Sequence, residues 1–150
     1  MAASAYRCVY LRVHPTGKAT LSLSCDDGGQ SRQLAELVGD ELGMPSGDVK
    51  VVAQDLDRFG GGHGYVTSSS PGVTNAVRKT CAKIKDKSRY LAGGMLGTSP
   101  QSLNWSGDNF GGKRIEEIAL YAHAGAIELP AGPDGRQLEG SLDAQTTFRD

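Results

Sequence analysis

The alternation of apolar and polar positions in the first third of the chain predicts three β-strands and one helix. Polar and apolar residues alternate over Lys18–Cys25, as in a strand with one buried face, and the β-formers of Tyr6–Val13 predict a hairpin partner for it. Apolar residues then recur at helical spacing over Leu34–Leu42, and Gly43 is suited to end that helix. The valine-rich run Asp48–Ala53 predicts a third strand, which we expect to lie centrally in the sheet.

The rest of the chain is less regular. Apolar residues at helical spacing predict a second helix that begins at Val73. After Asp86 we expect a short helix with a Gly-Gly defect over Tyr90–Leu96, and then turns over Thr98–Gly112 that are anchored by Trp105 and Phe110. These are followed by a third helix over Lys113–Ala122, a Gly/Pro-rich loop over Ala124–Gly140 and an isolated strand over Leu142–Phe148. An isolated strand must pair with another strand, and its partner can belong to another chain.

This order of elements predicts an α/β (α+β) fold, with a mixed β-sheet and helices packed on one face. At 150 residues the chain has the length of a single domain, 1–150, in which residues of about 5–87 form the regular core and residues 88–150 are irregular.

Charge and composition exclude some classes of partner. The net charge is −1, so we expect no nucleic-acid partner and no membrane surface. Lysines and arginines cluster only over residues 78–89, where we expect a solvated helix face. Three widely spaced cysteines indicate reduced thiols, and no apolar run has the length of a membrane span, so we expect a cytoplasmic protein.

The most unusual stretch, Phe59–Gly72, is rich in glycine and then in hydroxyl residues and lies between a predicted strand and a predicted helix. In that position backbone N–H groups and the positive end of the helix dipole can bind an anion. A flexible surface linker remains the alternative. Neither a Gly-Lys-Ser/Thr ending nor a correctly spaced G-x-G-x-x-G is present.

A second glycine loop, ending at Gln30, also follows a predicted strand and precedes a helix, so both loops can lie at the same edge of the sheet. The Gln30 amide is suited to the edge of a heterocycle, or it is a surface residue. Asp26 with Asp27, and Asp55 with Asp57, are more typical of turns than of catalytic or metal-binding pairs. Three separated histidines do not indicate a zinc site, and only His63, inside the glycine-rich stretch Phe59–Gly72, is a functional candidate.

Several of these segments, in this order, resemble the large subunit of molybdenum hydroxylases, the family of xanthine dehydrogenase, aldehyde oxidase and aerobic carbon monoxide dehydrogenase. The family has a strand, a G-Q-G loop, a helix ending A-D-E-L-G-V-P and the run D-V-x-V-x-x-G-D-T-D. The matching segments here are His14–Ser24, Gly29-Gln30, Gly39–Pro45, Gly47–Val52 and Asp55–Asp57. Later segments match its pterin loop, an N-A-V helix start, an E-I-A helix and an L-E-A-x-x-x-F strand: Gly60–Gly64, Thr67–Ser70, Asn75–Val77, Lys113–Ala122 and Leu138–Phe148.

The resemblance implies a subunit of a molybdopterin-dependent hydroxylase or dehydrogenase. It places these residues at the cofactor: Gly28, Gly29 and Gln30 on the pterin, and Thr67, Ser68, Ser69 and Ser70 on the pterin or its phosphates. The implied cofactor is molybdopterin with molybdenum, as a cytosine dinucleotide, and flavin and iron–sulfur clusters are expected on other subunits. No catalytic residue and no metal ligand is assigned to this chain.

The resemblance covers only an interior piece of such a subunit. The G-G-G-F-G loop upstream and the Gly-Glu downstream that supplies the catalytic base are missing, so we expect a split large subunit, not catalytic alone, with the remaining large-subunit chain as partner and a small-molecule substrate. Ser31 replaces a family glycine, and the loop after Asp57 is shorter. A purely structural subunit and an unrelated phosphate-binding module are therefore the alternatives.

Overall fold

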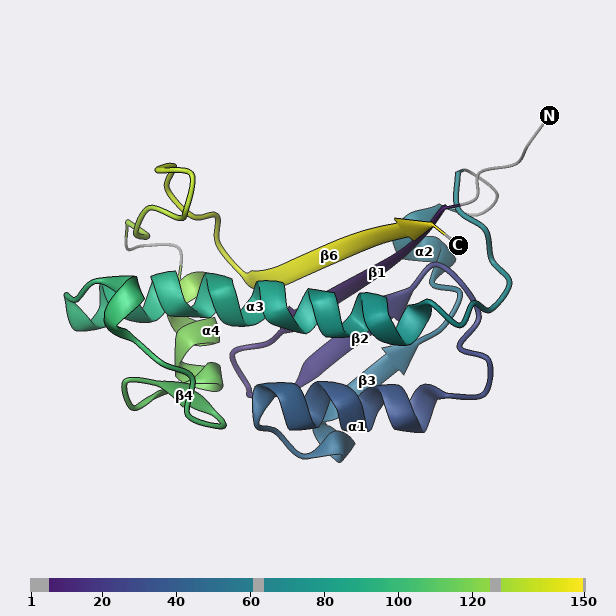
Figure 1. The fold of residues 1–150 in the computed structure, drawn as a ribbon, viewed down its shortest axis with the longest axis horizontal. Helices are drawn as coiled ribbons and strands as arrows, with labels where there is room; N and C mark the ends of the chain where they lie inside the picture. The colour runs from purple at the N-terminus through teal and green to yellow at the C-terminus, as the bar shows by residue number, and fades with distance from the viewer. Residues whose placement is uncertain (1–5, 61–63, 125–127, 150) are drawn as a thin grey trace.

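The computed structural model describes residues 6–60, 64–124 and 128–149, and a four-stranded mixed sheet lies at its centre (Figure 1). In chain order its strands are β1 (Tyr6–Val13), β2 (Ala19–Leu23), β3 (Val49–Val52) and β6 (Leu142–Arg149). Across the sheet the order is β3-β2-β1-β6. β1 is antiparallel to β2 and to β6, whereas β2 and β3 are parallel.

Two long helices, α1 (Ser31–Leu42) and α3 (Val73–Leu96), cover one face of this sheet (Figure 1). Leu11 in β1 pairs with Leu21 in β2 and Ala144 in β6, so one row of apolar side chains crosses the sheet. Leu11, Leu21 and the apolar faces of α1 and α3 belong to one core cluster, and Ala144 packs against it. The predicted fold class, a mixed sheet with helices on one face, is confirmed.

The shorter elements lie mainly at the ends of the sheet. They are η1 (Ser46–Asp48), α2 (Leu56–Phe59), η2 (Pro100–Ser102), β4 (Asn109–Phe110), β5 (Lys113–Arg114) and α4 (Ile115–His123). Phe110 is fully buried, and the Trp105 ring packs against it with 5.1 Å between the ring centroids, so these two aromatic residues anchor the irregular segment as predicted. No helix in the described part of the chain combines the length and apolar character needed to cross a membrane.

Two predictions about the strands are wrong. β3 is an edge strand, not a central one, because among the described residues only β2 pairs with it. β6 is not isolated: it pairs with all eight residues of β1, from Tyr6 with Arg149 to Val13 with Leu142. A hydrophobic run indicates a strand, but the position of that strand in the sheet depends on contacts that are distant in sequence.

Residues Tyr90–Leu96 are helical as predicted, but a separate short helix is wrong, because they belong to α3, which continues through the Gly-Gly pair without a break. Both glycines are sites of close packing. A Cβ on Gly93 would lie 2.9 Å from the carbonyl oxygen of Thr98, and one on Gly94 would lie 2.7 Å from Cγ of Pro130. The glycines therefore let other segments pack closely against α3, and these tertiary contacts outweigh the low helix propensity of glycine.

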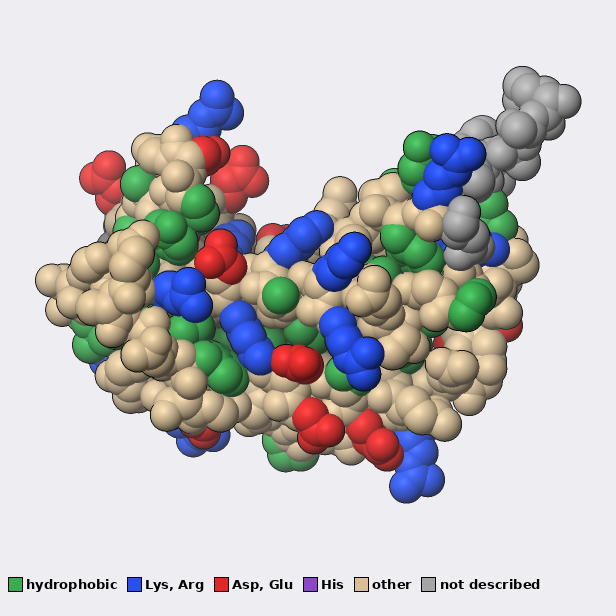
Figure 2. Space-filling model, in the orientation of Figure 1, with side chains coloured by type: hydrophobic (Ala, Val, Ile, Leu, Met, Phe, Trp, Pro, Cys, Tyr) green, Lys and Arg blue, Asp and Glu red, His purple; other side chains and the backbone are tan. Residues whose placement is uncertain are grey.

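The basic stretch of α3 is not merely a solvated face. Lys85 forms an ion pair with Glu41 of α1 at 2.6 Å, which joins the two helices. The ammonium groups of Lys83 and Lys87 donate to the carbonyl oxygens of Gln145 and Ser141, each at 2.7 Å. The mixed acidic and basic side chains over this face are visible in Figure 2.

Candidate functional site

The two glycine-containing loops meet at one end of the sheet, as the sequence predicts. The first, residues 24–30, joins β2 to α1; the second contains the hydroxyl loop, Thr67–Ser70, and precedes α3 (Figure 1). The backbone N–H of Asp26 donates to the carbonyl oxygen of Thr67 at 2.8 Å. A Cβ on Gly28 would lie 3.4 Å from Cβ of Ser69. The candidate cofactor residues of the two loops are therefore neighbours.

A tight turn presents Gln30 to solvent. Gly28 and Gly29 have φ angles of 61° and 78°, a left-handed conformation that glycine adopts without a steric cost. The turn places Gln30 at the start of α1, where the residue is exposed and its side chain makes no hydrogen bond with the described residues. Its amide group is thus available to a ligand.

Asp27 stabilises this turn. Its carboxylate accepts hydrogen bonds from the Gly29 N–H at 2.9 Å and from the Ser31 hydroxyl. These bonds, the one from Ser31 above all, lower the pKa of Asp27 below its usual value, so the group is ionised at neutral pH. Ser31, the residue that departs from the family pattern, therefore has a local structural role beside the site.

The hydroxyl loop presents three exposed residues and one buried one. Thr67, Ser68 and Ser69 are exposed, whereas Ser70 has only 6% of its surface exposed. The Ser70 hydroxyl oxygen accepts from the Gly72 N–H at 3.1 Å, so this side chain shapes the turn that begins α3. Within the described residues, no group accepts a hydrogen bond from the N–H of Ser68 or Ser69.

Arg7 supports this loop from inside the protein, and the sequence reasoning missed it. Its Nε donates to the Ser68 carbonyl oxygen at 2.8 Å, and its Nη2 donates to the Ser68 hydroxyl at 3.0 Å. Arg7 is only 6% exposed. A signal was present in the sequence, because Arg7 lies in the same alternating row of β1 as the buried Val9 and Leu11. A charge in a core-facing row requires polar partners.

Gln54 is the second residue that the sequence reasoning missed. Its φ angle is 49°, an uncommon value for a residue other than glycine. Its backbone N–H donates to the Cys25 carbonyl oxygen at 3.0 Å, and its side-chain Nε2 donates to the Thr67 carbonyl oxygen at 3.1 Å. Gln54 thus joins the end of β3 to both loops. The family run D-V-x-V-x-x-G-D-T-D has glycine at this position.

Asp55, Asp57 and His14 have other local roles or positions. Asp55 caps the short helix α2, where its carboxylate accepts from the Arg58 N–H at 3.3 Å, and Asp57 is exposed within that helix. His14 lies 2.9 Å from the Thr20 hydroxyl, and His63 lies outside the described residues. In the part of the chain that the structure describes, no three His, Cys, Asp or Glu side chains are gathered to hold a metal ion.

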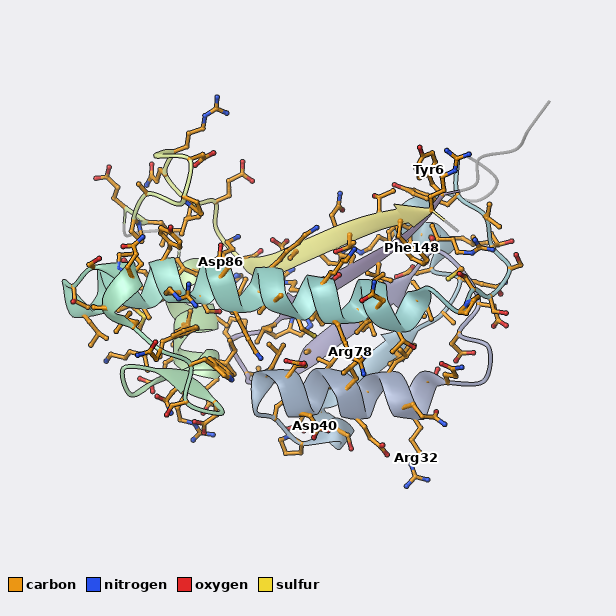
Figure 3. The ribbon with its side chains drawn as sticks, viewed as in Figure 1. Tyr6, Arg32, Asp40, Arg78, Asp86 and Phe148 are labelled. Atoms are coloured by element: carbon orange, nitrogen blue, oxygen red, sulfur yellow. The ribbon has the colours of Figure 1, made fainter. Side chains whose placement is uncertain are left out.

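The candidate residues of the two loops, apart from Ser70, are exposed at the surface of the described structure. A hollow of about 410 Å³ lies elsewhere, between α3 and residues 133–139, and a smaller one is lined by Gly17, Gly43 and Glu116. Tyr6 and Phe148, which Figure 3 labels, mark the end of the sheet at which the loops meet. Exposed N–H groups, hydroxyls and the Gln30 amide fit one side of a polar, anionic cofactor such as molybdopterin, and a ligand held there needs a second surface to cover it.

The described structure is an α/β domain with a loop-built polar surface at one end of its sheet. Residues 2–149 match the family model described as a molybdopterin cofactor-binding domain, and the chain belongs to this family.

The relatives include two carbon monoxide dehydrogenase large chains. The chain is 33% identical to that of Hydrogenophaga pseudoflava over 141 residues, which is 89% of this chain and 17% of the relative. It is 30% identical to that of Afipia carboxidovorans over 110 residues, 71% of this chain and 14% of the relative. The chain therefore spans less than a fifth of the length of these relatives. The resemblance to molybdenum hydroxylases is confirmed.

A solved structure has the same fold. The crystal structure of the Cu,Mo-CO dehydrogenase in its carbon monoxide-reduced state matches with a TM-score of 0.77 and 23% identity, over 97% of this chain and 19% of that chain. At this identity the match establishes the fold alone. The fold is thus that of a segment within a much longer polypeptide.

Proposed function

We propose that this chain supplies part of the molybdopterin cradle of a molybdenum-dependent oxidoreductase, as a subunit whose partner polypeptide completes the active site. The observation that carries the proposal is the approach of the two loops, through the hydrogen bond from the Asp26 N–H to the Thr67 carbonyl oxygen and the proximity of Gly28 to Ser69, which gathers exposed donors on one surface. Membership of the molybdopterin-binding family supports the same reading.

The two loops suit different parts of the cofactor. Asp27 is ionised beside the Gly28–Gln30 turn, so an anionic group is disfavoured there and the neutral pterin ring is favoured. The amide of Gln30 can both donate to the edge of this ring and accept from it. The phosphate groups then lie at Ser68 and Ser69, whose N–H groups and hydroxyls are donors near the start of α3.

The molybdenum centre supplies the oxidation chemistry when the cofactor is bound. This chain binds and orients the cofactor: hydrogen bonds from the hydroxyl loop fix the anionic end, and the glycine turn lets the backbone approach the ring. The open surface of the loops leaves the opposite side of the cofactor to a partner chain, which is where we place substrate binding and the catalytic base.

The finer details follow from the same family relationship. We place the protein in the cytoplasm, in a complex of the xanthine dehydrogenase type, with the cofactor as a cytosine dinucleotide and with flavin and iron–sulfur clusters on further subunits. A non-catalytic subunit that only stabilises its partner is the second candidate function, and the Ser31 replacement favours it. The two candidates differ in whether residues of the hydroxyl loop affect cofactor content.

The test compares Ser69→Ala with Ser69→Asp in the complex purified from cells. Removing the hydroxyl leaves the N–H donors in place, so we expect a loss of about 1 kcal/mol in binding. Adding a carboxylate about 4 Å from a phosphate costs about 1 kcal/mol in water and about 4 kcal/mol in a partly desolvated site. For Ser69→Asp we therefore expect the affinity for the cofactor to fall by between about fivefold and about a thousandfold.

The measurement is molybdenum and pterin per complex, with Ser106→Asp on an exposed turn as the matched control. The control is expected to retain normal cofactor content. Normal molybdenum and pterin in an intact Ser69→Asp complex would show that the hydroxyl loop does not hold the phosphate groups, and would favour the purely structural subunit.

A further inference from the structure

The hydroxyl loop is held through its carbonyl oxygens. The Thr67 oxygen accepts two hydrogen bonds, from the Asp26 N–H at 2.8 Å and from the Gln54 side chain at 3.1 Å. The Ser68 oxygen accepts from Arg7 Nε at 2.8 Å, and the Ser69 oxygen lies 3.5 Å from Arg7 Nη2. Three successive carbonyl groups of the loop thus face donors from β1, from the end of β3 and from the loop that joins β2 to α1.

These contacts fix the direction of the amide groups. A trans peptide is planar, and its C=O and N–H point in opposite directions. The Thr67 carbonyl shares a peptide with the Ser68 N–H, and the Ser68 carbonyl shares one with the Ser69 N–H. Because both carbonyls are held by donors, both N–H groups are turned away from those donors, where the described residues offer them no acceptor.

Gln54 holds its place at a conformational cost. With φ at 49° it adopts a backbone conformation that glycine accepts more readily. A glycine at this position would relieve the strain but would have no side chain to reach Thr67. The bond from Gln54 Nε2 is therefore a feature of the loop that depends on this side chain, and the strain is retained where the loops meet.

We propose that Gln54 and Arg7 are positioning residues: they hold the carbonyl groups of the hydroxyl loop from behind, so that the N–H groups of Ser68 and Ser69 stay directed at the anionic part of the cofactor. This inference rests on the function proposed above. Gln54 acts through Thr67, and Arg7 acts through Ser68 and Ser69, and neither is placed in contact with the cofactor.

The first experiment uses Gln54→Gly in the complex purified with its partner chains. Pterin release after dilution is measured by fluorescence, and thermal unfolding of the same complex is followed in parallel. We expect release to be about two to five times faster, the effect of one exposed hydrogen bond. We expect the melting temperature to stay the same or rise, because glycine relieves the strained φ angle.

Measuring pterin release and the melting temperature on the same complex distinguishes a positioning role from a general effect on stability. A residue with only a structural role would change the melting temperature without changing pterin release at a matched fraction folded. If the unmutated complex contains pterin and Gln54→Gly releases it at the same rate, the role of Gln54 is overturned. A wild-type complex that contains no pterin would overturn the proposed function itself and this inference with it.

The second experiment uses Arg7→Lys, which keeps the charge but cannot donate to Ser68 and Ser69 in the same geometry. We expect release to be about ten times faster, since bonds from a charged donor are stronger than neutral ones. Arg12→Lys, on the same strand but the opposite face of the sheet, is the matched control and should release pterin at the wild-type rate. Equal acceleration in both variants would mean general weakening of β1 and would overturn the role of Arg7.

Discussion

At the scale of single residues, Ser31 and Asp27 determine the shape of the turn that presents Gln30. The Ser31 hydroxyl and the Gly29 N–H both donate to the Asp27 carboxylate. The bonds favour the charged form of Asp27, and protonation of the carboxyl group weakens them. The turn is therefore expected to become less stable as the pH falls and Asp27 takes up a proton.

The first prediction concerns the pKa of Asp27. Ser31→Ala removes the largest cause of its lowered pKa, so we expect that pKa to rise toward the ordinary value of an aspartate carboxyl group. In the wild type, the stabilisation from this group is present above the unfolded-state pKa and is lost as pH falls through the lower folded-state pKa. An NMR titration of the Asp27 carboxyl carbon measures the shift. Ser46→Ala is the control, and an Asp27 titration midpoint that Ser31→Ala does not move would contradict the assignment.

The loops were predictable from sequence at this scale, but the residues that support them were not. Runs of glycine and hydroxyl residues between a strand and a helix marked both loops, and their contact is confirmed. The roles of Arg7 and Gln54 depend on which carbonyl groups lie within hydrogen-bond distance of their side chains. Those distances follow from how β1, β3 and the hydroxyl loop pack together. The sequence pattern alone shows that Arg7 lies in the core-facing row of its strand, but it does not show which groups Arg7 contacts.

At the scale of elements, local signals and tertiary packing agree in α1 and disagree in α3. α1 begins after the glycine turn and ends at Gly43, whose φ of 73° and N–H bond to the Gly39 carbonyl oxygen form the expected left-handed cap. α3 runs through Gly93 and Gly94, which local propensity marks as a break. Close contacts with Thr98 and Pro130 explain why glycine is needed there without ending the helix.

The second prediction tests the end of α1 with Gly43→Ala. The substitution places a residue with a side chain at a left-handed φ, and its Cβ would lie 2.4 Å from the Gly107 carbonyl oxygen. The strain and the forced shift of the neighbouring turn should lower the free energy of unfolding by about 2–4 kcal/mol. Chemical denaturation measures this difference.

Gly47→Ala is the matched control, because Gly47 has no atom within 4 Å of the added Cβ. We expect its free energy of unfolding to stay within about 0.5 kcal/mol of the wild type. Equal stability of the two variants would mean that the contact between the end of α1 and the turn at Gly107 is not maintained in solution.

At the scale of the whole molecule, the last strand of the described sheet pairs with the first. β6 occupies the edge beside β1, and α3 packs along it through the buried hydroxyls of Thr80 and Thr146, whose oxygens are 2.8 Å apart. The core cluster joins both strands to α1 and α3. The fold therefore has its own core, whereas the proposed cofactor surface is open on one side.

The third prediction concerns the 150-residue chain expressed alone. Because the four strands and the two long helices share one buried core cluster, we expect a folded protein with a cooperative thermal transition. Because the proposed surface covers only one side of the cofactor, we expect no retained molybdenum and no dye reduction with candidate substrates. Circular dichroism and metal analysis measure the two properties. Turnover by the isolated chain would contradict the shared active site, and the absence of a cooperative transition would contradict a self-contained core.

The pairing of β6 with β1 also has a consequence for the order of events during synthesis. The two strands are separated by about 130 residues, and β6 follows every other described helix and strand. At about 5–20 residues per second, β1 leaves the ribosome on the order of ten seconds before its partner exists. During that interval its Val- and Leu-rich edge is unpaired and can associate with the same strand of another nascent chain. The yield of soluble protein should therefore depend on translation rate and on chaperones that cover this strand until β6 arrives.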